Sequence, residues 1–325
     1  MHPAFSVIFL TTLIGIGQGL FLALYTGEVY ALFKVLPPQD GQQFYGMGSL
    51  LVMVFLGLGL FASFFHLGHP ERAWRAATRW RTSWLSREVI ALPAFMGVAF
   101  LYGVTHWLGM ETPVVYIGSV GLSISLILGA VATLLCFTLF VCTGMIYACI
   151  KFLQEWHSPL TVLNFILLGS ASGFTLATAF AYFAAPDLVD FYGAWAIIIT
   201  GGALLTRGAS LIRNARLKPK STIQTAIGVR HTKVVQKAQG FMGSSFNTRE
   251  FFHHMPAAVV RSVKWVFLVL VFPVPVVFLG SGLMSSSAAL MVLAVLVQYA
   301  GLLAERWFFF AQANHPQNLY YQSIA

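Results

Sequence analysis

Long runs without charged side chains recur along almost the whole of this 325-residue chain. About 20 apolar residues in a row can cross a bilayer as one helix, which satisfies its own backbone hydrogen bonds. Eight predominantly apolar runs lie at residues 6–33, 46–66, 87–108, 114–150, 159–184, 190–211, 261–283 and 285–310. The chain is therefore predicted to be all-α, a polytopic membrane helix bundle with eight transmembrane helices, forming one integral membrane domain over residues 1–325.

The composition supports a membrane protein. Hydrophobic residues make up 58% of the chain and charged residues 9%, whereas soluble domains have about 45–50% and about 25%. Cys136, Cys142 and Cys149 share one apolar run, so they are expected to be small packed residues without a disulfide framework or a metal site. The first run, broken only by Glu28, is too long for the core of a cleaved signal peptide and is expected to remain as a span.

Two of the runs are irregular. The run at 114–150 is too long for one span, so its helix tilts strongly, extends beyond the membrane or begins after Ser119. Pro273 and Pro275 are predicted to break the seventh span. Secondary transporters often carry such breaks in both halves of the chain. The first half shows no matching break, which weighs against a transporter without excluding one.

Basic residues are distributed unevenly between the connections. In a chain with eight spans, both termini and the loops after the second, fourth and sixth spans share one side of the membrane. That side carries 18 of the 19 Lys and Arg residues, and the other side carries only Lys34. Positive charge marks the cytoplasmic side, so both termini are predicted to be cytoplasmic. The orientation of the chain in the membrane thereby accounts for the excess of basic residues. Binding to nucleic acid is therefore not expected.

The longest polar segment is predicted to be a basic cytoplasmic loop between spans 6 and 7, at residues 213–260. It is longer than a connection between neighbouring spans requires. Two interpretations stay open, a solvated loop and a docking surface for a partner subunit. The second is suggested by the large apolar side chains of the loop, which are Phe241, Met242, Phe246, Phe251 and Phe252.

The connection between the second and third spans places ionisable groups where hydrocarbon meets water. His66 ends one span and Glu88 begins the next, and Gly68 and Pro70 turn the chain between them. Such groups are costly in a membrane unless they serve a function. The alternative is an ordinary positively charged loop with a capping histidine.

Further polar residues are predicted to approach the same side of the membrane. A quinone headgroup is a flat ring with two carbonyl acceptors, so its site needs hydrogen-bond donors, a carboxylate that exchanges protons and an apolar cleft. No histidine pair lies deep within the spans, so haem is not expected in this subunit. Simpler alternatives are a helix–helix hydrogen bond for Gln18 and a span terminus for Glu305 and Arg306. The candidate quinone-binding residues are Gln18, His66, Arg72, Glu88, Tyr147, Glu305 and Arg306.

One motif resembles a known family. The segment His66-Leu67-Gly68-x-Pro70-x-Arg72-Ala73, followed by Leu85-Ser86-x-Glu88, is similar to the signature of the membrane anchor subunits of dimethyl sulfoxide reductase-type molybdoenzymes (DmsC/NrfD-like). Gly17-Gln18, Tyr147 and Glu305-Arg306 also match family positions. The resemblance implies quinone (ubiquinone or menaquinone) as cofactor, with His66 and Glu88 linked to it. The implied partners are an iron–sulfur electron-transfer subunit and a catalytic subunit with molybdopterin guanine dinucleotide, and no catalytic or metal-binding residue is assigned to this chain.

The predicted orientation distinguishes between branches of that family. The dimethyl sulfoxide reductases work in the periplasm, whereas the charge count places the hairpin of this chain in the cytoplasm. Residues 147–160 and 246–252 resemble the anchors of cytoplasmic, quinone-dependent sulfite dehydrogenases. The resemblance therefore implies a bacterial inner-membrane anchor that passes electrons from cytoplasmic sulfite oxidation to quinone. An anchor of a dimethyl sulfoxide or polysulfide reductase that oxidises quinol is the alternative, followed by a secondary transporter.

The charge distribution generates a topology prediction. Reporter fusions at Arg79 and Gln239 should both read cytoplasmic, and a fusion at Leu188 should read periplasmic, because the basic connections stay on the side where translation occurs. The measurement is paired alkaline phosphatase and fluorescent-protein activity. A periplasmic reading at Arg79 would contradict both the orientation and the sulfite assignment.

Overall fold

The computed structural model describes residues 1–110, 112–118, 120–237 and 246–321. Within these residues, eight apolar helical segments are long enough to cross a bilayer, and the predicted eight-span helical bundle is confirmed. The spans are α1 (Phe5–Leu32), α2 (Met47–Ser63), α3 (Trp84–Trp107), α4 (Ile124–Ala148), α5 (Pro159–Ala184), α6 (Val189–Ala215), the pair α9 (Ala257–Val271) and α10 (Pro273–Ser285), and α11 (Ala288–Ala311).

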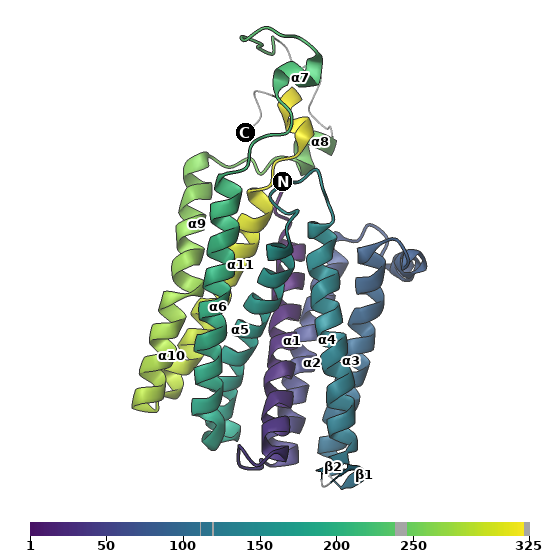
Figure 1. The fold of residues 1–325 in the computed structure, drawn as a ribbon, viewed down its shortest axis with the longest axis vertical. Helices are drawn as coiled ribbons and strands as arrows, with labels where there is room; N and C mark the ends of the chain where they lie inside the picture. The colour runs from purple at the N-terminus through teal and green to yellow at the C-terminus, as the bar shows by residue number, and fades with distance from the viewer. Residues whose placement is uncertain (111, 119, 238–245, 322–325) are drawn as a thin grey trace.

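Both chain termini lie at one end of the bundle (Figure 1). The α2–α3 connection, with the short 3-10 helices η2 (Phe64–His66) and η3 (Pro70–Arg79), lies at that same end. A two-stranded antiparallel ladder, β1 (Pro113–Ile117) and β2 (Val120–Ser123), lies at the opposite end. The termini and the predicted cytoplasmic hairpin therefore share one end, as expected. The compartment that this end faces stays a prediction.

The β1–β2 hairpin explains the overlong fourth apolar run. Gly118 has φ +61°, a left-handed conformation that glycine adopts without steric cost, and it lies in the turn between the two strands. The helix then begins at Ile124, where the Ser123 hydroxyl caps it by accepting a hydrogen bond from the Leu126 N–H (3.2 Å). Of the three alternatives, the late start of the span is correct.

The seventh span is interrupted, as its prolines predict. The helices α9 and α10 meet at Phe272, whose ψ of −78° departs from regular helix geometry. Pro275 has no N–H to donate to the carbonyl of Val271 four residues earlier. The side-chain amide of Gln298 on α11 donates to that carbonyl instead (3.3 Å). The break is thus satisfied by a neighbouring helix, as membrane helices require.

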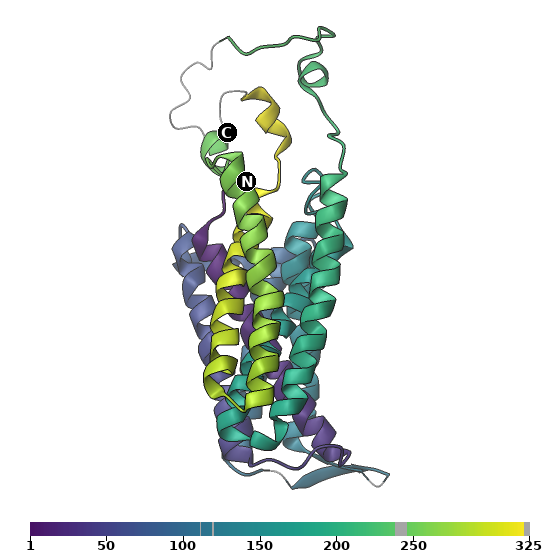
Figure 2. The same ribbon diagram turned by 90° about the vertical axis from the view of Figure 1, so that its left-hand side faces the viewer.

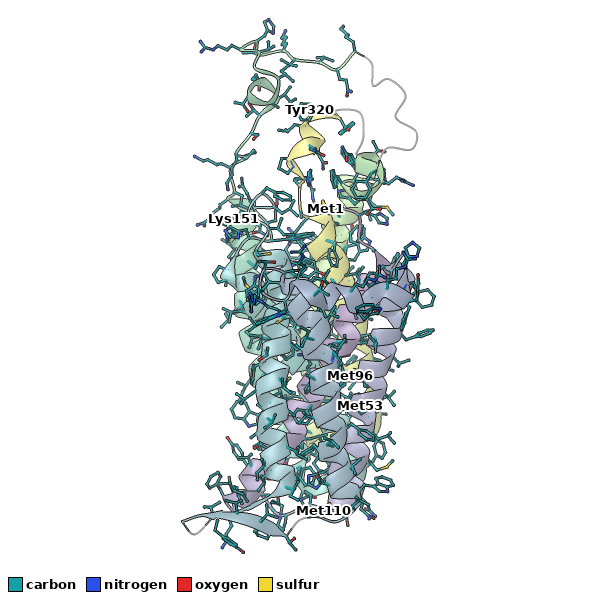
Figure 3. The ribbon with its side chains drawn as sticks, turned by 90° about the vertical axis from the view of Figure 1, so that its right-hand side faces the viewer. Met1, Met53, Met96, Met110, Lys151 and Tyr320 are labelled. Atoms are coloured by element: carbon teal, nitrogen blue, oxygen red, sulfur yellow. The ribbon has the colours of Figure 1, made fainter. Side chains whose placement is uncertain are left out.

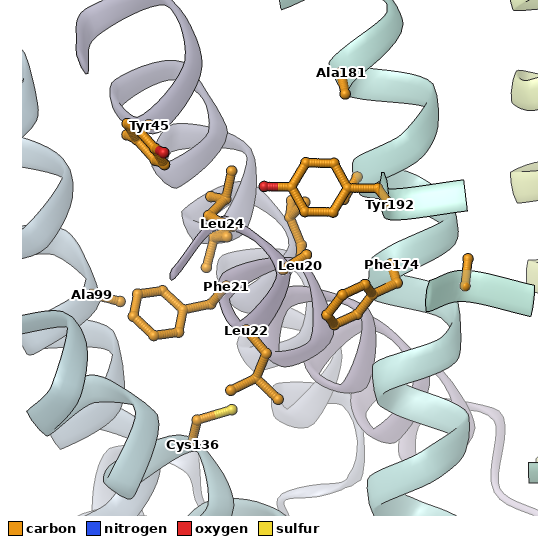
Figure 4. Packing of buried hydrophobic residues seen from close by; sticks show 14 of the residues in the cluster. Leu20, Phe21, Leu22, Leu24, Tyr45, Ala99, Cys136, Phe174, Ala181 and Tyr192 are labelled. Carbon is orange, nitrogen blue, oxygen red and sulfur yellow. The ribbon is translucent and has the colours of Figure 1, made fainter. Parts of the chain in front are cut away.

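Helices α1 and α5 form the centre of the bundle, and each is more buried than its neighbours. Gly15 and Gly19 of α1 face Gly169 and Gly173 of α5, so the two backbones touch directly. Apolar side chains pack around this contact (Figure 4). Phe21, for example, packs edge-on against Phe95 and Tyr102, with ring centroids 5.4 Å apart in both pairs.

The long connection after α6 extends beyond the same end of the bundle as the termini (Figure 2). It contains α7 (Ile223–Ile227) and α8 (Phe246–Glu250) and is shorter at both ends than the predicted 213–260, because α6 continues to Ala215 and α9 begins at Ala257.

Some of the aromatic residues in this connection are covered by the chain itself. Phe251 stacks on His315 (3.7 Å between ring centroids), and Phe252 is buried, whereas Phe246 is exposed. Phe241 and Met242 lie outside the described residues, as does Gln239.

The glycine contact between α1 and α5 generates a stability prediction. Gly173→Ala should lower the free energy of unfolding by about 1–3 kcal/mol, because the added methyl group collides with the backbone of Gly19 and Leu20. Gly97→Ala is the matched control, since its methyl group meets nothing within 4 Å. The measurement is thermal unfolding of the purified protein in detergent. Equal stability of the two variants would show that the α1–α5 contact tolerates separation.

Candidate functional site

A narrow cavity with about 20 Å³ of free space lies inside the bundle, in the half that is closer to the chain termini. Residues of five helices line it, so the tertiary fold rather than any one segment creates it. Its polar lining comes from α1, α3, α4, α5 and α11, and the remaining wall is apolar. The polar residues are Thr11, Thr12, Gln18, Glu88, Thr143, Ser172 and Arg306, and the large apolar residues are Leu10, Ile14, Phe140, Phe165, Leu168 and Leu302.

Two of the polar groups are held by neighbouring helices. The Thr143 hydroxyl on α4 donates a hydrogen bond to Glu88 Oε1 on α3. The Gln18 side-chain amide donates to the carbonyl of Cys136 on α4 (2.9 Å). The helix–helix hydrogen bond considered for Gln18 is therefore present, and the same residue also lines the cavity. Both groups are thus held in place at the cavity wall.

Arg306 supplies positive charge to the cavity. Its side chain is buried, and its guanidinium carbon lies 3.8 Å from the ring centroid of Phe165. Tyr147 stacks on Phe165 as well, with ring centroids 5.6 Å apart and ring planes at 9°. Tyr147 does not line the cavity. It lies behind Phe165, in an aromatic cluster with Trp156, Phe309 and Phe310.

Glu305 points away from the cavity toward α6. Its Oε1 lies 2.7 Å from Nε of Arg207, and its Oε2 lies 3.4 Å from Nε of Arg306. All three side chains are at least 95% buried. One carboxylate between two guanidinium groups leaves a net charge of +1 beside the cavity.

His66 and Arg72 lie outside the cavity. His66 ends η2, which contacts α1 near the bundle end, and its side chain is exposed. Arg72 is exposed on η3 and pairs with Glu71 (3.5 Å). The structure therefore brings Gln18, Glu88 and Arg306 together in one cavity and places the other candidates behind it or on the adjoining surface.

The sequence reasoning missed two buried ionic clusters. Arg207 was counted among the basic residues of the connections, but it is 1% exposed inside α6, where Glu305 compensates its charge. At the opposite end of the bundle, Glu28 of α1 lies 3.5 Å from Nε2 of His106 and accepts a hydrogen bond from Ser125 (2.6 Å). The detectable signal in each case was an ionisable residue inside an apolar run.

A family model described as DMSO reductase anchor subunit (DmsC) matches residues 1–321. This chain belongs to the DmsC family. It is 58% identical to a sulfite dehydrogenase subunit of Allochromatium vinosum over 326 residues, which cover 100% of both chains. It is also 28% identical to the anaerobic dimethyl sulfoxide reductase chain YnfH of Escherichia coli over 168 residues, covering 50% of this chain and 56% of that protein. As a DmsC-family member with eight spans, the chain is a multi-pass membrane protein.

The charge cluster of this DmsC-family chain generates a stability prediction. Glu305→Gln should cost about 3–5 kcal/mol of unfolding free energy, because two buried guanidinium groups then lose their carboxylate. Arg207→Gln should cost less, since Arg306 still pairs with Glu305. Glu71→Gln, on the exposed hairpin, should change the stability by no more than ~1 kcal/mol. Thermal unfolding in detergent measures the stability of all three variants. Unchanged stability of Glu305→Gln would contradict the assignment of Glu305 as the carboxylate that compensates the two buried guanidinium groups.

Proposed function

We propose that this protein is the membrane anchor and quinone-reacting subunit of a sulfite dehydrogenase. The full-length identity of 58% to a sulfite dehydrogenase subunit supports the sulfite-oxidising complex. The cavity lined by Gln18, Glu88 and Arg306 is the observation that supports a quinone site. On this proposal the partners are an iron–sulfur subunit, which delivers electrons, and a molybdopterin subunit, which oxidises sulfite.

The overall reaction balances in electrons and protons. Sulfite and water give sulfate, two protons and two electrons in the catalytic partner. A quinone takes up two electrons and two protons to become a quinol. The anchor must therefore hold the quinone ring within reach of the iron–sulfur subunit and give it protons from water.

The lining of the cavity is suited to these tasks. Arg306 offers fixed positive charge where negative charge develops on a quinone oxygen during reduction. Glu88 provides a carboxyl group that can transfer a proton, and Thr143 holds that group in position. Phe140 and Phe165 provide apolar wall for a flat ring. Gln18 contributes an amide whose orientation is set by Cys136.

The surface beside the cavity fits a docking role on this proposal. The α2–α3 hairpin carries exposed Arg72, Trp74 and Trp80 at the end of the bundle that holds both termini. Exposed aromatic and arginine side chains are typical of protein interfaces. We assign this end to the cytoplasmic face of a bacterial inner membrane, where the iron–sulfur subunit would cover the hairpin. The family resemblance links His66 to quinone. On this proposal the quinone site therefore extends from the cavity to the α2–α3 hairpin, which the iron–sulfur subunit covers.

A dimethyl sulfoxide or polysulfide reductase anchor is the second candidate. The family description and the similarity to YnfH favour it. In that case quinol would be oxidised at the same cavity, and its electrons would pass from this subunit to the catalytic partner. Measuring sulfite-to-quinone and quinol-to-dimethyl-sulfoxide activity with the purified complex separates the two candidates.

The cavity generates an activity prediction. Glu88→Gln should lower the rate of sulfite-to-quinone electron transfer by about 10²-fold or more, because an amide cannot transfer the proton. Electron transfer from sulfite to an artificial dye should be unchanged, since the dye accepts electrons before they reach this subunit. Asp187→Asn is the matched control, because it removes an exposed carboxylate at the opposite end of the bundle.

The same two assays test the contribution of the hairpin. His66→Ala should also lose quinone reduction and keep dye reduction if the site reaches from the cavity to the covered surface. Full quinone activity in His66→Ala would confine the site to the cavity. Full quinone activity in Glu88→Gln would refute the cavity as the quinone site.

A further inference from the structure

A second hollow lies on the outer side of the helices that enclose the cavity. It is a groove of about 590 Å³ between α3 and α4, two helices that lie side by side toward the viewer in Figure 3. Its wall is almost entirely apolar and includes Ala91 and Ala94 of α3 and Leu134, Phe137 and Val141 of α4. Leu134 is 70% exposed on the surface of the chain, which indicates that the groove faces the lipid.

The groove and the cavity share one wall. Arg87 and Cys142 line the groove, whereas the next residues along the same helices, Glu88 and Thr143, line the cavity. The Glu88–Thr143 hydrogen bond joins α3 to α4 at this level. The two hollows are therefore separated by the α3–α4 contact at Glu88 and Thr143, which we call the seam.

The shape of the cavity requires a path of this kind. The cavity has about 20 Å³ of free space, which is room for a water molecule, so the helices around it must part to admit a ring, and a long hydrocarbon chain must stay outside. A quinone with its headgroup in the cavity must therefore pass its tail out between two helices. The α3–α4 groove is a large apolar hollow that adjoins the polar groups of the cavity.

The lining of the groove favours an uncharged occupant over a phospholipid. Arg87 is the charged residue among those that line the groove, and two of its five N–H donors are in use. Its Nε donates to the Trp80 carbonyl and its Nη2 to the Arg81 carbonyl, both at 2.9 Å. Its guanidinium group also stacks 4.1 Å from the ring centroid of Trp84. The rest of the wall is almost entirely apolar, which suits an isoprenoid chain along its length better than a lipid headgroup.

We propose that the α3–α4 groove binds the isoprenoid tail of the quinone, and that the headgroup reaches the cavity through the seam closed by Glu88 and Thr143. This inference rests on the proposed function and adds the access route. It gives Glu88 a second task, because the carboxyl group that transfers a proton also lies in the passage. Opening the seam breaks the Glu88–Thr143 bond and frees that carboxyl group for an arriving quinone.

The test uses the whole complex in proteoliposomes and two quinones with the same ring. One carries a full-length isoprenoid tail and the other a single isoprene unit. Ala94→Trp fills the groove, so the apparent KM for the long-tailed quinone should rise about tenfold, as expected from the loss of roughly two methylene contacts. The KM for the short-tailed quinone and the rate with the artificial dye should stay unchanged. Gly97→Trp is the matched control, since it lies on α3 outside the groove lining, where an added Cβ meets nothing within 4 Å.

A second variant tests the opposite wall. Thr138→Trp on α4 should give the same dependence on tail length, which keeps the test valid if Ala94→Trp fails to assemble. Unchanged kinetics with both quinones in an assembled groove variant would overturn the tail assignment, as would an equal rise in KM for both. Failure of the proposed function is distinct, because the wild-type complex would then reduce the dye and neither quinone.

Discussion

The direct backbone contact between α1 and α5 is the constraint on which the rest of the bundle depends. Glycines on both helices remove the side chains that would hold the helices apart. This central pair joins the first four spans to the last four, because α1 also packs against α2 and α4 and α5 against α6 and α11. Gly15 and Gly169 line the cavity as well. The same missing side chains thus bring the helices together and leave a small free space beside them.

The spans could be predicted from the sequence because a bilayer imposes one dominant requirement on each of them. Run length and low charge located all eight, and Pro273 and Pro275 located the break in the seventh. The late start of α4 was only one of three alternatives, and the hairpin before it was not predicted, since its strands are as apolar as the span that follows. The spacing Gly15-x-x-x-Gly19 was a readable sign of close helix packing, and Gly169-x-x-x-Gly173 was its counterpart.

The site was harder to predict than the spans. Residue type, depth and family resemblance pointed to seven residues, of which Gln18, Glu88 and Arg306 share a cavity. Their partners Thr143 and Phe165 could not be predicted from the sequence. These side chains face the cavity because of how α4 and α5 are oriented about their axes, and only packing against other helices determines that orientation. The same reason explains Arg207. A charge count along the chain cannot distinguish an arginine in a loop from one that faces a carboxylate a hundred residues away.

The ion pair between Arg207 and Glu305 also bears on how the chain is made. Arg207 belongs to the sixth span and Glu305 to the last, so a growing chain inserts the arginine well before its partner has been synthesised. Until then, the guanidinium group must stay near the membrane surface or keep water around it. Only the arrival of α11 allows α6 to settle at its final depth. Assembly of the bundle is therefore tied to the synthesis of α11, and a chain truncated before α11 leaves Arg207 without this carboxylate partner.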